Sequence, residues 1–291
     1  MNKKGLTISM IFQAESANYG SGYSNLSVLK KMMRGDLKEY SYISRQAIRY
    51  NIIKELEWDN TPVEAMGSAN ATVVQFAPTA TIKDYPEIDL FGYMKTAKGQ
   101  DGGATTRNAV VRLSNAIALE PFEGNSDYLT NMGLAKRKGI NNNIAESEIQ
   151  LSYYAYTITI DLDKVGIDGN IQIDNDEKAR RVNALLDVVE YLYRDIRGRR
   201  ETLAPIFIIG GVYERKNPFF EHRLKLNENN LILAPITEMF DDESIKENTL
   251  VGLLNGIFSN DEEINSVLKP ESVHQVFKEL KVKVKEYYET N

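Results

Sequence analysis

The sequence predicts an α+β fold built on a ferredoxin-like sheet that large insertions interrupt. Two segments, Leu6–Phe12 and Leu151–Leu162, alternate apolar and other residues with the two-residue period of a half-buried strand. Two further segments, from Ser44 to about Trp58 and Asp176–Arg197, repeat apolar residues at helical spacing. The apolar run Pro205–Val212 is typical of a buried strand. With strands also expected between the two helices, this order matches the βαββαβ pattern.

The 291 residues are expected to form a single domain, since one core can still serve a chain of this length. Its core is predicted at about residues 1–57 and 150–236. The stretch between them, about 58–149, contains Pro, Gly and Asn clusters without a long hydrophobic period, and we interpret it as insertions. Residues 237–291 are expected to form an acidic helical region, with helices at about Asp242–Phe258 and Glu271–Tyr288.

Composition excludes several classes of protein. The chain has no cysteine, which rules out disulfides, thiolate metal sites and a cysteine nucleophile, and suits a reducing cytoplasm. No window approaches the roughly 18 apolar residues of a membrane span. We therefore expect a cytoplasmic protein without a membrane partner.

The net charge of −6 argues at first against a nucleic-acid partner. The acidic excess, however, lies in residues 235–291, and basic residues gather in the segment Lys30–Lys54. Local patches, and not the total charge, set the field that a polyanion meets. Solvated helix faces remain the simpler explanation of any single patch.

The sequence contains no recognisable catalytic signature. The two histidines, His222 and His274, have no partner at metal-ligand spacing. There is no Gly-x-Ser-x-Gly motif and no phosphate-binding loop that ends in Lys-Ser/Thr. We therefore predict a protein that is not an enzyme and needs no metal or cofactor.

The start of the first predicted helix is the richest local group of polar residues. Ser44 is a suitable N-cap, and free amides in the first helical turn can bind a phosphate. Arg45 and Arg49 are four residues apart and share a helix face, and Gln46 adds a donor and an acceptor. The alternative is an ordinary capped amphipathic helix with exposed arginines.

The predicted excursion at residues 123–148 combines cations with apolar side chains. The basic residues Lys136 and Arg137 lie near Met132 in the sequence. Such a mixture suits single-stranded RNA, because phosphates attract cations while bases stack on flat or apolar groups. The alternative is a solubilising loop tip.

Several stretches together carry a resemblance to a known family. They are Thr7–Gly20, Tyr42–Arg49, Asp89–Met94, Thr105–Arg107, Leu113–Leu119 and Tyr156–Gly166. Over most of residues 6–212 the chain resembles the DevR/Cst family, the "Cas seven" backbone subunits of type I-B CRISPR–Cas systems.

The resemblance implies an RRM-like palm with a finger-like insertion and a thumb-like hairpin. RRM domains share the βαββαβ topology and bind single-stranded RNA. The implied function is to bind CRISPR RNA in the antiviral Cascade complex and to present it for pairing with target DNA. The implied partners are the CRISPR RNA, target DNA through the guide, other Cascade subunits and head-to-tail copies of this chain.

The resemblance also implies roles for particular residues. The first helix and the loop before it would hold the RNA backbone, two arginines would lie on the finger side, and Met132 would be the wedge of the thumb. The implied RNA-binding residues are Asn18, Tyr19, Ser44, Arg45, Gln46, Arg49, Arg107, Arg112, Met132, Lys136 and Arg137.

Two alternatives belong to other functional classes. One is a metal-dependent RNA nuclease subunit that uses a loop aspartate, for which Asp36 is the candidate. Asp36 lies among Lys31, Arg34 and Lys38, so an ion-pair role explains it more simply. The other alternative is a stand-alone regulatory protein, which only the DevR family name suggests.

Overall fold

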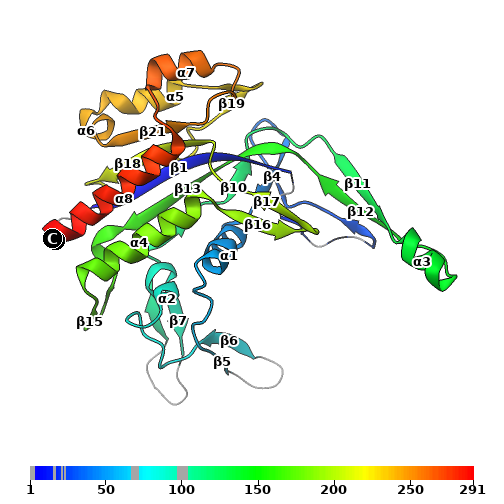
Figure 1. Ribbon diagram of the computed structural model, residues 1–291, viewed down its shortest axis with the longest axis horizontal. Coiled ribbons are helices and arrows are strands. Elements are labelled where there is room, and N and C mark those ends of the chain that lie inside the picture. Colours follow the sequence, from blue (N-terminus) through cyan, green and yellow to red (C-terminus); the bar gives the residue numbers. More distant parts are fainter. Residues whose placement is uncertain (1–3, 16–17, 21, 23, 67–71, 97–103) are drawn as a thin grey trace.

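A central eight-stranded antiparallel sheet dominates the computed structural model (Figure 1), which describes residues 4–15, 18–20, 22, 24–66, 72–96 and 104–291. The strands are β1 (Gly5–Ala14), β3 (Lys31–Met33), β4 (Glu39–Ile43), β9 (Val111–Leu113), β10 (Ala116–Ala118), β13 (Ser152–Asp161), β18 (Phe207–Tyr213) and β21 (Thr249–Leu253). Their order across the sheet is β21–β18–β1–β13–β10–β4–β3, and β9 also pairs with β13.

The chain order contains the predicted succession of strand, helix, strands, helix and strand, but β3 and β4, between β1 and α1, were not predicted. Strand β1 leads into helix α1 (Arg45–Glu55), then β9, β10 and β13, then helix α4 (Asn175–Glu190) and finally β18. Ser44 caps α1, because its hydroxyl accepts a hydrogen bond from the Ala47 amide at 3.3 Å. The α+β class is confirmed.

Two hydrophobic clusters cover the two faces of the sheet. Helices α4 and α8 (Val273–Thr290) pack on one face, where α8 also contacts β18 and β21. That cluster contains Leu6, Ile8, Met10, Leu185 and Leu280, all fully buried. On the other face, a second cluster lies over β18 and β21 and includes α5 (Ala234–Thr237), α6 (Glu243–Lys246) and α7 (Asp261–Leu268). None of the helices in the described ranges is long and apolar enough to cross a membrane.

The helix predicted at 176–197 is too long. Helix α4 ends at Glu190, and a hairpin of β16 (Tyr193–Ile196) and β17 (Arg199–Thr202) follows. At its turn, Arg197 and Gly198 have φ angles of 50° and 76°. Positive φ at both central residues is typical of the type I′ turn, whose twist suits a hairpin.

The helix predicted at 242–258 is also wrong. Only Glu243–Lys246 is helical there, and Thr249–Leu253 forms β21. This strand pairs with β18 from Phe207↔Leu253 to Gly211↔Thr249, so it satisfies the backbone of a buried strand. The C-terminal region therefore contributes both a strand and helix α8 to the main sheet and its core.

The predicted insertions form two projections from the sheet (Figure 1). The first, here called the lobe, holds β5 (Val63–Met66), β6 (Val73–Phe76), α2 (Pro86–Phe91), β7 (Tyr93–Lys95) and β8 (Thr105–Arg107). The second, here called the arm, consists of β11 (Asn125–Thr130), α3 (Met132–Lys138) and β12 (Ile144–Ile149). The remaining short elements are β2 (Leu26–Ser27), β14 (Ile167–Asp168), β15 (Ile171–Gln172), β19 (Leu226–Asn227), β20 (Asn230–Leu231) and the 3₁₀ turns Leu162–Lys164 and Glu238–Asp241.

A buried carboxylate fastens the lobe to the sheet and its helices. Asp89, on α2, is fully buried and forms ion pairs with Arg107 at 2.6 Å and with Arg181 of α4 at 2.9 Å. It also accepts a hydrogen bond from the Gly166 amide at 2.9 Å. A buried charge is tolerated only when it is paired and hydrogen-bonded, and Asp89 meets both conditions.

Replacing Asp89 with asparagine should therefore destabilise the whole protein. The substitution Asp89→Asn removes the buried carboxylate that two guanidinium groups share, leaving Arg181 only with Glu177 and Arg107 only with the more distant Asp168. We expect the free energy of unfolding to fall by about 3–5 kcal/mol. Urea unfolding followed by circular dichroism measures this loss. Asp195→Asn is the matched control, because the Asp195–Arg200 pair is well exposed and should contribute less than about 1 kcal/mol. Equal losses in the two variants would contradict the assigned role of Asp89.

Candidate nucleic-acid interface

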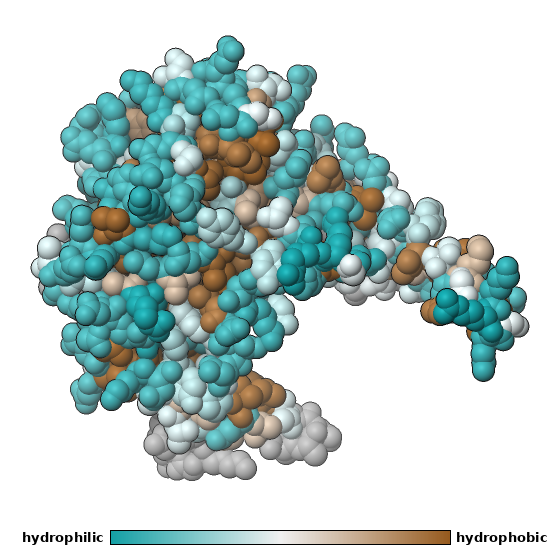
Figure 2. Space-filling view, in the orientation of Figure 1, coloured by the Kyte–Doolittle hydropathy of each residue, from teal (hydrophilic) through white to brown (hydrophobic). Residues whose placement is uncertain are grey.

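One side of the molecule is hollowed between the arm and the lobe (Figure 2). Helix α1 lies beside this hollow, between the sheet and the lobe (Figure 1). The hollow is thus bordered by α1, the lobe and the arm. Helix α1 carries three of the predicted RNA-binding residues, Arg45, Gln46 and Arg49, and Ser44 is its N-cap.

Four side chains of α1 form a patch, here called the α1 surface: Arg45, Gln46 and Tyr50, which are exposed, and Arg49, which is half-buried. Arg45 and Gln46 are exposed, and neither side chain has a hydrogen bond or ion pair with the described residues. The guanidinium of Arg49 lies 4.9 Å from the centre of the Phe91 ring. Burial lowers the pKa of Arg49, while the nearby Glu87 carboxylate opposes that shift. These cations can therefore accept an external anion.

Tyr50 was not among the residues predicted from the sequence. Its side chain is 61% exposed, although tyrosine is usually at least half-buried. Positions 45, 46, 49 and 50 lie one turn apart on one helix face. The sequence could have indicated Tyr50, because it directly follows Arg49 on the polar side of the predicted helix. An exposed ring beside two cations can stack on a base.

The start of α1 is held by side chains from two other segments. The Asn18 side-chain oxygen accepts a hydrogen bond from the Ser44 amide at 2.5 Å, and that of Asn115 accepts one from the Arg45 amide at 2.9 Å. The Ser44 hydroxyl is occupied by the Ala47 amide. Asn18 and Ser44 therefore have structural roles here, and the first helical turn offers fewer free amides to a phosphate than the sequence suggested. Ser16 and Ala17, which precede Asn18 in the motif, lie outside the described residues.

Arg107 was predicted to contact RNA, but the structure places its side chain among internal partners. Its side chain is only 7% exposed, and its guanidinium binds the Asp89 carboxylate and the backbone oxygens of Asp89, Lys164 and Ile167. All of these partners are internal. Arg107 therefore stabilises the lobe and does not form part of the candidate interface.

Arg112 is only partly committed to an internal partner. It donates to the Asp161 carboxylate at 3.0 Å, while its side chain remains 47% exposed. Burial alone would raise the pKa of Asp161, but the hydrogen bond from Arg112 and the charge of Lys216 hold that pKa below its usual value. Arg112 thus keeps exposed surface but is already paired.

The tip of the arm is both apolar and basic. Met132 begins α3 and is 62% exposed, and Leu134 is 65% exposed. Lys136 and Arg137 lie in the last turn of this helix, where cations complement the helix dipole. Figure 1 shows this tip at the far end of the arm, so the structure does not bring it next to the α1 surface.

Tyr19 lies at the root of the arm and is half-buried. Its hydroxyl donates to the Glu148 backbone oxygen at 3.1 Å, and the Arg197 guanidinium lies 4.0 Å from its ring centre. Both ends of this side chain therefore have partners within the protein.

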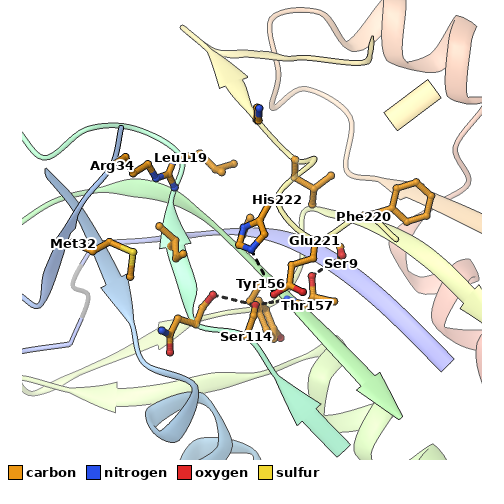
Figure 3. Close-up of a pocket in the computed structure, with 15 residues that line it drawn as sticks. Ser9, Met32, Arg34, Ser114, Leu119, Tyr156, Thr157, Phe220, Glu221 and His222 are labelled. Atoms are coloured by element: carbon orange, nitrogen blue, oxygen red, sulfur yellow. Dashed lines mark hydrogen bonds and ion pairs between the residues drawn. The ribbon is translucent and has the colours of Figure 1, made fainter. Parts of the chain in front are cut away.

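The face of the sheet opposite α4 and α8 carries a cavity of about 410 Å³ (Figure 3). Ser9 and Thr157 line it, and their hydroxyls are hydrogen-bonded at 2.7 Å. Phe220 and His222 also line the cavity, from the segment after β18. RRM domains stack bases on aromatic side chains of the sheet, whereas Ser9 and Thr157 present hydroxyls here.

Asp36, the aspartate of the nuclease alternative, has a structural explanation. It lies between β3 and β4, where its carboxylate accepts hydrogen bonds from the Tyr40 hydroxyl at 2.6 Å and the Lys38 amide at 3.1 Å. The bond from Tyr40 lowers the pKa of Asp36 most strongly. Within the ranges that the structure describes, no three His, Asp or Glu side chains gather as metal ligands.

The antiparallel sheet with its helices and two projections defines an α+β class of protein, and comparison with known proteins identifies the family. The family model of "CRISPR-associated negative auto-regulator DevR/Csa2" matches residues 6–229. The chain therefore belongs to this CRISPR-associated family. A comparison with curated proteins gives no match.

Solved structures show the same fold. A chain from a "CRISPR RNA-guided surveillance complex, pre-nicking" aligns with a TM-score of 0.54 and 11% identity, covering 87% of this chain and 93% of that chain. A chain from another "CRISPR RNA-guided surveillance complex" aligns with a TM-score of 0.53 and 14% identity, covering 87% and 90% respectively. At such low identity the similarity extends to the fold alone.

The geometry at the start of α1 predicts different effects for neighbouring residues. Asn18→Ala removes the acceptor of the Ser44 amide, and we expect it to lower the free energy of unfolding by about 1–3 kcal/mol. Gln46→Ala changes an exposed side chain without an internal partner and should alter stability by less than about 0.5 kcal/mol. Chemical denaturation of both variants gives the two values. A larger loss for Gln46→Ala would reverse our assignment of these roles.

Proposed function

We propose that this chain is a CRISPR RNA-binding backbone subunit of the Cascade complex, which polymerises along the guide RNA and presents it for pairing with target DNA. Membership of the DevR/Csa2 family supports this proposal. The observation that carries it is the α1 surface, where Arg45 has no internal anion and Arg49 packs on a ring beside the hollow. Two cations four residues apart repel each other, so an external polyanion would relieve that repulsion.

In this proposal the sheet with α1 and α4 is an RRM-like palm. The antiparallel order β18–β1–β13–β10 supports it, because it places the first and third strands of a βαββαβ unit at the centre. The lobe corresponds to the fingers and the arm to the thumb. The sequence motifs favour the type I-B subtype.

The proposed mechanism is binding and not bond cleavage. Contacts to phosphates position a nucleic acid without reading its sequence. Arg45, Gln46 and Arg49 would hold the sugar–phosphate chain in this way, and the base edges would stay free to pair with DNA. Sequence recognition is thereby left to the guide.

Repeated copies would bind head to tail. Such contacts join two different surfaces of each copy and generate an open filament, whose length the RNA would limit. The apolar tip of the arm supports this arrangement, since Met132 and Leu134 remain 62% and 65% exposed in the single chain. A neighbouring copy with its RNA would cover them.

Charge reversal of the α1 surface should remove RNA binding but leave the fold intact. For Arg45→Glu/Arg49→Glu we expect weaker binding to single-stranded RNA and a salt dependence whose slope falls by about 1.4, since each lost phosphate contact contributes about 0.7. Fluorescence anisotropy at several salt concentrations measures both quantities. Arg180→Glu/Lys285→Glu is the control, because it makes the same change in net charge on α4 and α8, where both residues are exposed. If the two double variants bound RNA equally, the α1 surface would not be the site.

The proposal also predicts what the protein carries when it is isolated from its host. We expect short RNAs that share a common end derived from the repeat, because a backbone subunit retains its guide. Sequencing the nucleic acid that co-purifies at moderate salt identifies them. Protein free of RNA under these conditions would favour the stand-alone regulator.

A further inference from the structure

The arm has little packing to hold its direction. All six residues of β11 are exposed, and in β12 only Ser147 is buried. A two-stranded hairpin is marginally stable by itself, and only the root end of β12 pairs with another strand, β2. The contacts at the root of the arm must therefore set its angle to the sheet.

One arginine joins three separate segments at this root. Arg197, at the turn of the β16–β17 hairpin, lies over the Tyr19 ring at 4.0 Å and donates a hydrogen bond to the Ser147 hydroxyl. Tyr19 in turn donates to the Glu148 backbone oxygen of the arm. We call Arg197, Tyr19 and Ser147 the latch.

The hairpin that carries Arg197 has a firm base. Arg194 and Glu201 form an ion pair at 2.7 Å, and their side chains are only 4% and 7% exposed. Arg199 adds ion pairs to Glu15 at the end of β1 and to Glu201. The type I′ turn then places Arg197 at the end of a support that is fixed to the sheet.

A second set of contacts at the arm root leads to a different part of the chain. The Glu148 carboxylate binds the Leu29 amide at 2.8 Å and the Lys31 ammonium at 3.0 Å, and β12 pairs with β2. These contacts join the arm to the segment before β4. Arg197 adds the connection to the hairpin that follows α4, so the arm is held from two directions.

We propose that Arg197 is a positioning residue, which through the latch holds the arm at a fixed angle to the sheet and α1. This geometry does not depend on any ligand. If the proposed function is correct, the latch also sets the separation between the arm tip and the α1 surface, and hence the spacing of RNA contacts; that consequence rests on the proposed function.

The protein is well suited to a direct test, because it has no cysteine of its own. We would place spin labels at Lys138→Cys on the arm tip and Asp176→Cys on α4, two exposed positions, and measure their distance distribution in the full chain without RNA. The parent protein should give one narrow distribution. Arg197→Ala should broaden that distribution and shift its mean, since both the ring contact and the hydrogen bond are lost.

Several variants separate positioning from a general loss of structure. Ser147→Ala keeps the contact between Arg197 and Tyr19 and should broaden the distribution less than Arg197→Ala does. The broadening in Arg197→Lys should be intermediate between those of Ser147→Ala and Arg197→Ala. Arg200 lies on the same hairpin but pairs with Asp195, so Arg200→Ala should leave the distance distribution unchanged. A second label pair within the body, Asp176→Cys and Glu262→Cys, should be insensitive to all four variants.

A distribution in Arg197→Ala that matches the parent would overturn the proposal. So would broadening of the body pair, because the effect would then be general unfolding. Neither result bears on RNA binding. Failure of the latch and failure of the proposed function are therefore distinguishable, since the second is measured with RNA and the α1 variants.

Discussion

The buried ion pairs of Asp89 with Arg107 and Arg181 are the constraint on which the candidate interface depends. They join the lobe to α4, and they fix helix α2 beside α1. Phe91, two residues further along α2, provides the ring on which Arg49 packs. The position of a proposed RNA contact thus follows from a charge cluster that itself has no access to RNA.

A division between supporting and exposed residues recurs at the start of α1. Asn18, Ser44 and Asn115 satisfy backbone amides there, which fixes the helix and occupies their own side-chain oxygens. Arg45 and Gln46 remain exposed without internal partners. A hydrogen-bonded helix start beneath long, exposed polar side chains suits a surface that holds phosphates without selecting a sequence.

The arm, unlike α1, is held mainly by contacts at its root. Strand β11 is exposed along its whole length, and the arm is held through the root end of β12 and the contacts there. Tyr19 and Arg197 contact each other at the root of the arm. The resemblance had placed Tyr19 next to the RNA, and the helical spacing had placed Arg197 in a helix. The same aromatic and basic residue types can thus support a projection as readily as they contact a nucleic acid.

The sequence by itself determined the features that depend on neighbouring residues. Period-two alternation predicted β1 and β13, helical spacing predicted α1 and α4, and the residue type at position 44 predicted the cap. The joint motifs also predicted the CRISPR-associated family, which the comparison confirmed.

Only the tertiary structure decided which arginines are available. Arg45 and Arg107 look alike in sequence, yet one is exposed and the other is enclosed by Asp89 and three backbone oxygens from distant segments. Strand β21 likewise formed where a helix was predicted, because β18 offered an unpaired edge. In both cases the deciding partners are far away along the chain, and local propensity carries no information about them.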